Sequence, residues 1–291
     1  MELQDYLKAK RPNLSPSSIY SYCSTLRALH KRLFGDTIID INNFHNTELI
    51  LTHLKNKEPP TRKTSLAILY SLTDEEIYRT EMLNDIEKIN AIIETQEMNE
   101  KQKEAHRSQQ EIKALFDTYE EEANTLYKKD TLTNNDKQII QKYIILALTS
   151  GLFIPPRRSL DWCEFKINNI TPDSNYLDGD NLVFNRYKGS ATKGQQVVSC
   201  PAQLKNLLYK WIAVNSNDYL LFDKNGNKLS SVKMNQRLNQ IFDGKTGTSA
   251  LRHTYLTDKY KETSQETKNL AKEMKQMGSS INMATTYIKL K

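Results

Sequence analysis

The chain has 291 residues and a formal net charge of +6 at pH 7, with 41 Lys or Arg against 35 Asp or Glu. This length predicts about one or two domains, and the modest positive charge is compatible with a polyanionic partner. No stretch approaches the roughly 18 consecutive apolar residues of a membrane span, so we expect no membrane partner. The start of the chain lacks an apolar signal core, and the three cysteines form neither a metal nor a disulfide pattern. We therefore expect an intracellular protein that uses no metal and no cofactor.

The first 75 residues have the pattern of a small helical domain. Ser15 followed by Pro16 is typical of a helix start, because serine caps free N–H groups and proline fits the first turn. Apolar residues then recur at helical spacing until Gly35, a residue typical of a helix end. We expect two further helices, near 46–56 and 62–72.

Residues 74–129 are highly charged and contain neither Pro nor Gly. This pattern predicts a solvated long helix, or a helix pair, that bridges two domains, with a partner-binding helix as the alternative. Apolar residues are fewest near 100–110, where we place the domain boundary. The predicted organisation is a helical domain at 1–75, a charged helical linker at 76–109 and a second domain at 110–291.

The second domain shows a mixed pattern. The apolar stretch 139–152 predicts a buried helix, which is interrupted by Pro155-Pro156. Two short apolar runs at 182–184 and 197–198 flank a polar loop and predict a β-hairpin. The fold class is therefore mainly α with a small β-hairpin or sheet. We expect further helices at 201–213, 231–242, 250–262, 266–277 and 282–289.

Several residues of this domain could act together on a phosphodiester. Its transition state gathers negative charge on non-bridging oxygens, and the planar guanidinium of arginine matches two such oxygens at once. A lysine near the leaving oxygen can donate a proton, and a nucleophile must face the phosphorus. The candidates, in chain order, are Arg157 or Arg158, Lys188 or Lys193, Arg252 and Tyr287.

The arginine pair and the hairpin lysines resemble the first half of a tyrosine recombinase (phage integrase) active site. In that family an arginine follows a Thr/Ser-Gly-Leu turn, with an acidic residue three positions on. Arg158 and Asp161 fit that spacing, but four residues are inserted before the arginines, so Arg157 stays an alternative. The family's catalytic lysine lies on a β-hairpin, where Lys188 matches and Lys193 is the second choice.

The C-terminal motifs resemble the second half of the same active site. Arg252 lies in Ser-Ala-Leu-Arg-His-Thr, which is similar to the family's His-x-x-Arg box, with Ser249 in place of the first histidine and His253 as a substitute helper. Met-Gly-Ser-Ser resembles the family's Leu/Met-Gly-His-Ser, with Ser279 in place of His or Trp. Tyr287 follows Ser279 by eight residues and matches the nucleophile. Taken singly, each motif also has a plain structural interpretation, such as a surface basic pair or a buried histidine.

The resemblance implies a two-domain clamp on double-stranded DNA, built from a helical core-binding domain and a mixed α/β catalytic domain. It implies site-specific recombination or integration through a 3′-phosphotyrosyl intermediate, by a homotetramer on paired sites, without a metal. The Pro-Pro-Arg-Arg sequence is similar to recombinase-like proteins of large eukaryotic DNA viruses and virophages, so a viral or mobile element is expected. In the first domain the expected phosphate contacts are Lys8, Lys10, Arg11, Ser18, Arg27, Arg62 and Lys63.

Three alternatives follow from the same residues. The two replacements of histidine, by Ser249 and Ser279, fit a recombinase-like DNA-binding protein that has lost catalysis. The arginine, lysine and tyrosine chemistry is shared by type IB topoisomerases, which relax DNA without a specific site. An unrelated helical scaffold with a charged interaction helix would show no salt-dependent DNA binding.

Overall fold

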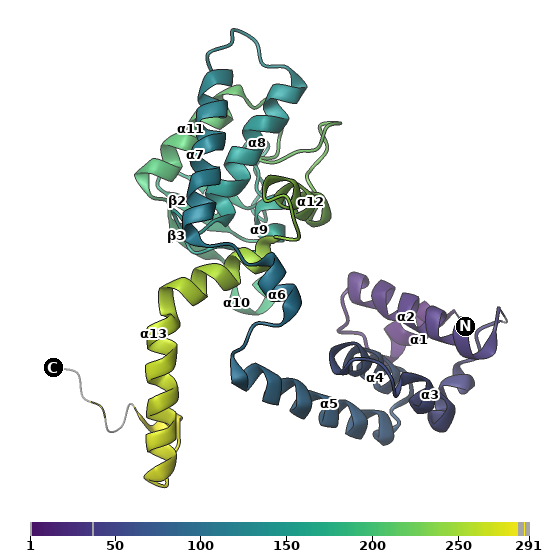
Figure 1. Cartoon of the computed structure of the whole chain (residues 1–291). Coiled ribbons are helices and arrows are strands. Elements are labelled where there is room, and N and C mark those ends of the chain that lie inside the picture. The colour runs from purple at the N-terminus through teal and green to yellow at the C-terminus, as the bar shows by residue number, and fades with distance from the viewer. Residues whose placement is uncertain (1, 37, 285–287, 289–291) are drawn as a thin grey trace. The chain divides into compact units, whose positions relative to one another are not determined.

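The computed structural model describes residues 2–36, 38–284 and 288. The described chain is mainly helical, with a small three-stranded antiparallel sheet (Figure 1). It forms two compact units, Met1–Glu97 and Met98–Lys291, and each unit has its own hydrophobic core. Among the described helices, none combines the length and the apolar character that a membrane crossing requires.

The first unit is helical. Ser15 accepts a hydrogen bond from the N–H of Ser18 at the start of α2, and Gly35 ends α2 with a φ of +78°, so the predicted start and end are confirmed. Leu26, Leu66 and other apolar side chains of these helices form the core. The elements are α1 (Leu3–Lys10), α2 (Pro16–Phe34), the 3-10 helix η1 (Ile41–His45), α3 (Thr47–Leu54), α4 (Pro59–Thr73) and α5 (Glu76–Thr95).

Helix α5 packs along α4 and belongs to the first unit, which differs from the linker expected at 76–109. Tyr78 is fully buried, and its hydroxyl donates a hydrogen bond to the Phe44 carbonyl at 2.8 Å. Arg62 of α4 pairs with Asp85 at 2.8 Å and with Glu81. Glu81 and Asp85 belong to the charged stretch that predicted a solvated helix, but both pair with the largely buried Arg62. The charge of the sequence alone therefore could not locate the boundary between the two units.

The second unit surrounds α8 (Asn134–Thr149), which packs against α7 (Gln109–Leu126), α11 (Ala202–Val214) and α12 (Ser231–Ile241). Its residues from Tyr143 to Thr149 are all buried, as the apolar stretch predicted. The remaining elements are α6 (Glu100–Ala105), α9 (Ser159–Cys163), α10 (Ser190–Lys193), α13 (Thr248–Gln276) and the 3-10 helix η2 (Ile281–Met283).

The sheet consists of β1 (Tyr176–Asp178), β2 (Asn181–Phe184) and β3 (Gln196–Ser199) in the order β1-β2-β3. The predicted hairpin is confirmed as β2 and β3, in which Phe184 lies opposite Gln196. The sequence did not predict β1, because three residues are too few to show an alternating pattern. Trp162 and Phe165 both pack edge-on against Phe184 and are tilted against each other, so the short helix α9 is held against the sheet.

Helix α13 is a single helix of 29 residues, where the sequence predicted separate helices at 250–262 and 266–277. No Gly or Pro lies between those two ranges, so nothing interrupts the hydrogen bonding of the helix. Leu251 and Thr254 are buried in its first turns, and most of its later side chains are exposed. Within the range 282–289, where a helix was expected, the described residues include part of the 3-10 helix η2, then Ala284 in helical conformation, whose carbonyl accepts a hydrogen bond from the N–H of Ile288 at 2.8 Å.

Candidate active site

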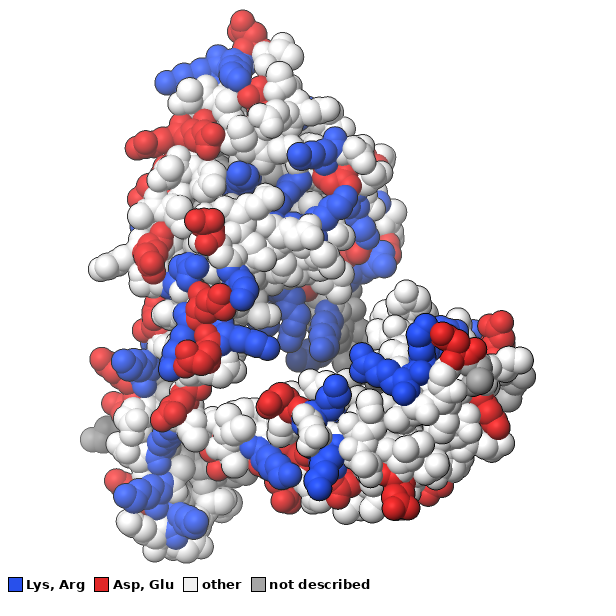
Figure 2. Space-filling view, turned by 45° about the vertical axis from the view of Figure 1, so that its right-hand side comes forward, with Lys and Arg blue, Asp and Glu red and all other residues white. Residues whose placement is uncertain are grey.

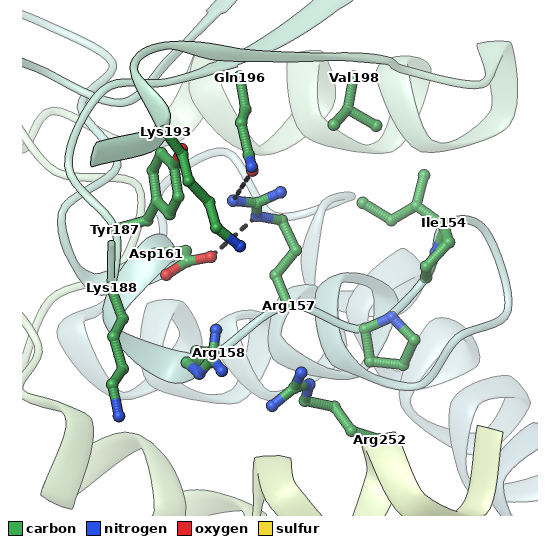
Figure 3. Close-up of a pocket in the computed structure, with 12 residues that line it drawn as sticks. Ile154, Arg157, Arg158, Asp161, Tyr187, Lys188, Lys193, Gln196, Val198 and Arg252 are labelled. Atoms are coloured by element: carbon green, nitrogen blue, oxygen red, sulfur yellow. Dashed lines mark hydrogen bonds and ion pairs between the residues drawn. The ribbon is translucent and has the colours of Figure 1, made fainter. Parts of the chain in front are cut away.

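A pocket of about 270 Å³ lies where the segment before α9, the loop between β2 and β3, and the first turns of α13 meet (Figure 3). Five cationic side chains and one carboxylate line it, so the pocket is strongly positive. Such a concentration of charge favours a bound anion. The charged lining residues are Arg157, Arg158, Asp161, Lys188, Lys193 and Arg252.

Gly151 allows α13 to lie close to the segment that carries Arg157 and Arg158, here called the arginine segment. It adopts a φ of +86°, a conformation that favours glycine, and a Cβ at this position would lie 2.5 Å from the Tyr255 ring. Tyr255 follows Arg252 by three residues, so the two side chains share a face of α13. The close approach of Tyr255 to the Gly151 backbone therefore places Arg252 beside the chain that leads to Arg157 and Arg158.

Arg157 is held inside the protein. Its Nε donates to Asp161 Oδ2 at 2.9 Å, and its terminal nitrogen donates to the Gln196 side chain at 3.0 Å. Its guanidinium carbon lies 3.8 Å from the centre of the Phe184 ring. A stacked and hydrogen-bonded guanidinium of this kind ties α9 to β2 and β3. Arg157 therefore has a clear structural role, and its charge is largely balanced by Asp161.

Asp161 is the one carboxylate of the pocket. Burial raises its pKa, and this effect is opposed by the charges of Arg157, Arg158 and Arg252. Its second oxygen, Oδ1, is buried and has no hydrogen-bond partner among the described residues. The acid is thus within electrostatic reach of all three arginines, but it forms an ion pair only with Arg157 in the part of the chain that is described.

The other four cations of the pocket differ from Arg157 in this respect. Within residues 2–36, 38–284 and 288, no acidic group pairs with Arg158, Arg252, Lys188 or Lys193. In Figure 3, Arg158 lies between the ends of Lys188 and Arg252 in the lower part of the view. Because like charges repel, a bound phosphate would relieve an unfavourable interaction as well as make new hydrogen bonds.

The loop between β2 and β3 presents both lysines. It contains the short helix α10, with Gly189 (φ +97°) before it and Gly194 (φ +68°) after it. The Tyr187 hydroxyl donates to the Gly194 carbonyl at 2.7 Å and closes the loop. Lys188 therefore lies at the exposed entry of a closed loop and Lys193 at its exit.

The structure does not bring every predicted site residue to this pocket. Ser249 and His253 are exposed on α13 and do not line it. Ser279 follows the far end of α13, about 36 Å along the helix from Arg252 at 1.5 Å per residue. Tyr287 lies outside the described residues. Gln196 and Tyr187 line the pocket but were not singled out from the sequence; Gln196 could have been found from the hairpin register, which sets it opposite Phe184.

The residues of the first unit that were expected to contact DNA fall into two groups. Lys10 pairs with Asp74 at 2.8 Å, Arg11 pairs with the same carboxylate, and Arg62 is occupied by Glu81 and Asp85. The charges of these three residues are already paired within the first unit, so they are less suited to binding DNA. Of the residues expected to contact DNA, Lys8, Arg27 and Lys63 have no ion pair among the described residues, and Ser18 hydrogen-bonds to Ser15. Figure 2 shows Lys and Arg interspersed with Asp and Glu on the surface.

Buried thiols do not offer a competing nucleophile. All three cysteines are free and buried, and none lines the pocket. Burial raises the pKa of Cys163 to about 12 and the pKa of Cys200 to about 11. Both thiols therefore stay protonated near neutral pH, which fits a packing role.

Comparison with known proteins adds little to this geometry. No family model and no curated protein matches the chain. Among solved structures, the chain is similar to the crystal structure of XerA recombinase, with a TM-score of 0.37 and 14% sequence identity, over 100% of this chain and 95% of that chain. Similarity at this level is too weak to establish a shared fold.

Proposed function

We propose that the chain is a tyrosine-type, site-specific DNA strand transferase, and that the positive pocket holds the scissile phosphate. The observation that carries the proposal is the meeting of Arg158, Lys188 and Arg252 in one pocket without acidic partners among the described residues. These residues come from three separate segments of the sequence. A structural role would pair such cations with carboxylates, as Arg157 is paired, whereas a phosphate site leaves them free.

Arg158 and Arg252 bind the two non-bridging oxygens of the phosphate. Their guanidinium groups stabilise the negative charge that gathers there as a nucleophile attacks. Arg157 and Asp161 hold the segment that carries Arg158 in place. Arg157 remains the alternative ligand, but its Nε and one terminal nitrogen are already used within the protein.

Tyr287 is the proposed nucleophile. Its hydroxyl oxygen attacks phosphorus and forms a 3′-phosphotyrosyl ester, while the bond from phosphorus to the 5′ oxygen breaks. Lys188, with Lys193 as the alternative, gives a proton to that oxygen, so the products are the covalent adduct and a free 5′ hydroxyl. A 5′ hydroxyl of a partner strand reverses the step. Recombination requires two duplexes, so we propose a homotetramer on paired sites.

One observation favours a second candidate, a DNA-binding protein with impaired catalysis. Ser249 and His253 lie outside the pocket, and Ser279 lies beyond the far end of α13 from Arg252. A single subunit in this arrangement holds a phosphate with the arginines, but its pocket lacks the helper groups of the Ser-Ala-Leu-Arg-His-Thr and Met-Gly-Ser-Ser motifs. This candidate binds DNA through the pocket and forms no covalent adduct.

A covalent-capture experiment tests the proposal. A library of nicked duplexes from the source genome is incubated with wild-type protein, with Tyr287→Phe and with Tyr260→Phe as a matched control on α13. We expect a denaturation-resistant adduct with wild type and Tyr260→Phe but not with Tyr287→Phe. An adduct that persists in Tyr287→Phe would exclude this nucleophile, and salt-sensitive binding without any adduct would favour the DNA-binding candidate.

A further inference from the structure

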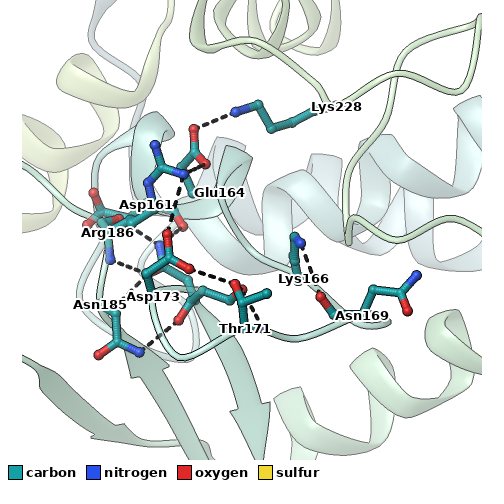
Figure 4. Close-up of polar contacts among 11 residues, drawn as sticks. Asp161, Glu164, Lys166, Asn169, Thr171, Asp173, Asn185, Arg186 and Lys228 are labelled. Atoms are coloured by element: carbon teal, nitrogen blue, oxygen red, sulfur yellow. Dashed lines mark hydrogen bonds and ion pairs between the residues drawn. The ribbon is translucent and has the colours of Figure 1, made fainter.

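Outside the pocket, one buried side chain joins the two segments that carry its cations. Asn175, just before β1, has no exposed surface, and its amide makes four hydrogen bonds. Its Nδ2 donates to the carbonyls of Asp161 and Arg186 at 2.8 and 2.7 Å. Its Oδ1 accepts from the N–H groups of Asn185 and Arg186 at 2.8 and 2.7 Å. Figure 4 shows the contacts around Asp161, Asn185 and Arg186.

These four bonds satisfy the whole hydrogen-bonding capacity of an amide side chain. They also connect two particular segments of the chain. The Asp161 carbonyl belongs to α9, at whose start Arg158 stands, and Arg186 lies two residues before Lys188. Both polar groups of the Arg186 backbone are bound by the same side chain. Asn175 therefore connects the start of the loop between β2 and β3, which carries Lys188, directly to the arginine segment.

Asn175 is itself held firmly. Its carbonyl accepts from the N–H of Lys166 at 2.7 Å, and the preceding Ser174 carbonyl accepts from the Asn185 side chain at 2.8 Å. Arg157 also links the segment before α9 to Phe184 and Gln196 at the ends of β2 and β3, whereas the ion pair at Arg186 is weaker. Arg186 reaches Glu164 at 3.6 Å with a side chain that is 58% exposed, and that carboxylate is already bound by Lys228 at 2.6 Å. An exposed pair of this kind contributes little to rigidity.

We propose that Asn175 is a positioning residue, which sets the distance between Lys188 and the phosphate-binding arginines. This inference rests on the proposed function. Lys188 is exposed and has no partner of its own among the described residues, so its reach is determined by where the backbone at Arg186 and Tyr187 lies. Proton transfer requires the donor within hydrogen-bond distance of the leaving oxygen, and a displaced loop loses that contact while the arginines still bind.

A DNA substrate with a different leaving group can distinguish a positioning role of Asn175 from a general role in folding. In the normal DNA substrate the 5′ oxygen must receive a proton as its bond to phosphorus breaks. In a substrate with sulfur at that bridging position, a thiolate departs without a proton, because the pKa of a thiol is only about 8.5. A defect in proton donation is therefore relieved by sulfur, and a defect in phosphate binding is not.

The variants are Asn175→Ala, the isosteric Asn175→Asp, Lys188→Ala and Arg252→Ala, with Asn168→Ala as an exposed-asparagine control. With the oxygen substrate we expect Asn175→Ala to slow adduct formation about 10- to 100-fold, at unchanged DNA affinity, as partial loss of a general acid would. With the sulfur substrate we expect Asn175→Ala, Asn175→Asp and Lys188→Ala to approach the wild-type rate. Arg252→Ala should stay slow on both substrates, and Asn168→Ala should match wild type.

The ratio of the two rates on one preparation does not depend on how much of that preparation is folded, so a destabilised variant still gives an answer. Equal slowing on both substrates would overturn the positioning role and leave the proposed function intact. The same holds if Asn175→Ala reacts as fast as wild type with the oxygen substrate. Absence of any adduct with wild type would overturn the proposed function, and this role with it.

Discussion

Replacing Gly151 by alanine should destabilise the second unit more than an ordinary glycine replacement does, because two penalties meet there. Its φ of +86° strains any residue with a Cβ, and that Cβ would lie 2.5 Å from the Tyr255 ring. The left-handed conformation costs about 1–2 kcal/mol, and displacing a packed ring costs about 1–3 kcal/mol. We therefore expect Gly151→Ala to lower the free energy of unfolding by about 2–5 kcal/mol.

Gly179 offers the matched control. It also has a positive φ, +55°, but no atom lies within 4 Å of the Cβ that alanine would add. Gly179→Ala should therefore show the backbone strain alone, about 1–2 kcal/mol. Urea unfolding followed by circular dichroism measures both variants, and adding Tyr255→Ala to Gly151→Ala should remove the excess as a coupling of about 1–3 kcal/mol. If Gly151→Ala unfolds at the same urea concentration as Gly179→Ala, the close approach of Tyr255 to Gly151 is wrong.

Three further predictions concern charge. Arg62→Ala removes the hydrogen-bonded partner of Asp85, which is 1% exposed and keeps only a 4.0 Å pair with Lys88 among the described residues, so it should cost the first unit about 3–5 kcal/mol in denaturant unfolding, against less than about 0.5 kcal/mol for Lys63→Ala. Asp136 has a pKa lowered to about 2 by its hydrogen bonds to Lys129 and Thr133, so folding favours its ionised form. That stabilisation should be complete above pH about 4 and lost as the pH falls toward 2, and Asp136→Asn should lack this part of the pH dependence of the urea midpoint. Arg27→Ala should reduce the slope of log affinity for DNA against log salt by about 1, whereas Arg11→Ala, whose charge is paired with Asp74, should change it less; equal slopes would place Arg27 away from DNA.

Local signals in the sequence predicted local structure well. Ser15 and Gly35 mark the ends of α2 because capping depends on side chains next to the helix in sequence. The buried character of α8 is likewise visible in one apolar stretch. The order of Arg158, Lys188 and Arg252 indicated a common phosphate site, and the structure brings all three to one pocket, although their role stays a prediction.

Long-range partners could not be predicted in the same way. Arg62 was expected at a DNA surface, but two acids some twenty residues later hold it within the first unit. Arg157 and Arg158 could not be separated from the sequence, because the choice depends on Asp161, Gln196 and the Phe184 ring. Asn175 carries no motif at all, since its importance arises only from the four backbone groups that surround it.

Adjacent arginines suggest redundancy, in which one replaces the other after a mutation. Here the chain at Arg158 is extended, with φ −70° and ψ 150°, so consecutive side chains leave the backbone on different sides. The guanidinium of Arg157 forms an ion pair with Asp161 inside the protein, whereas the side chain of Arg158 is exposed. The two arginines are therefore not interchangeable, because an exchange of their places would require a one-residue shift of the chain between Gly151 and α9.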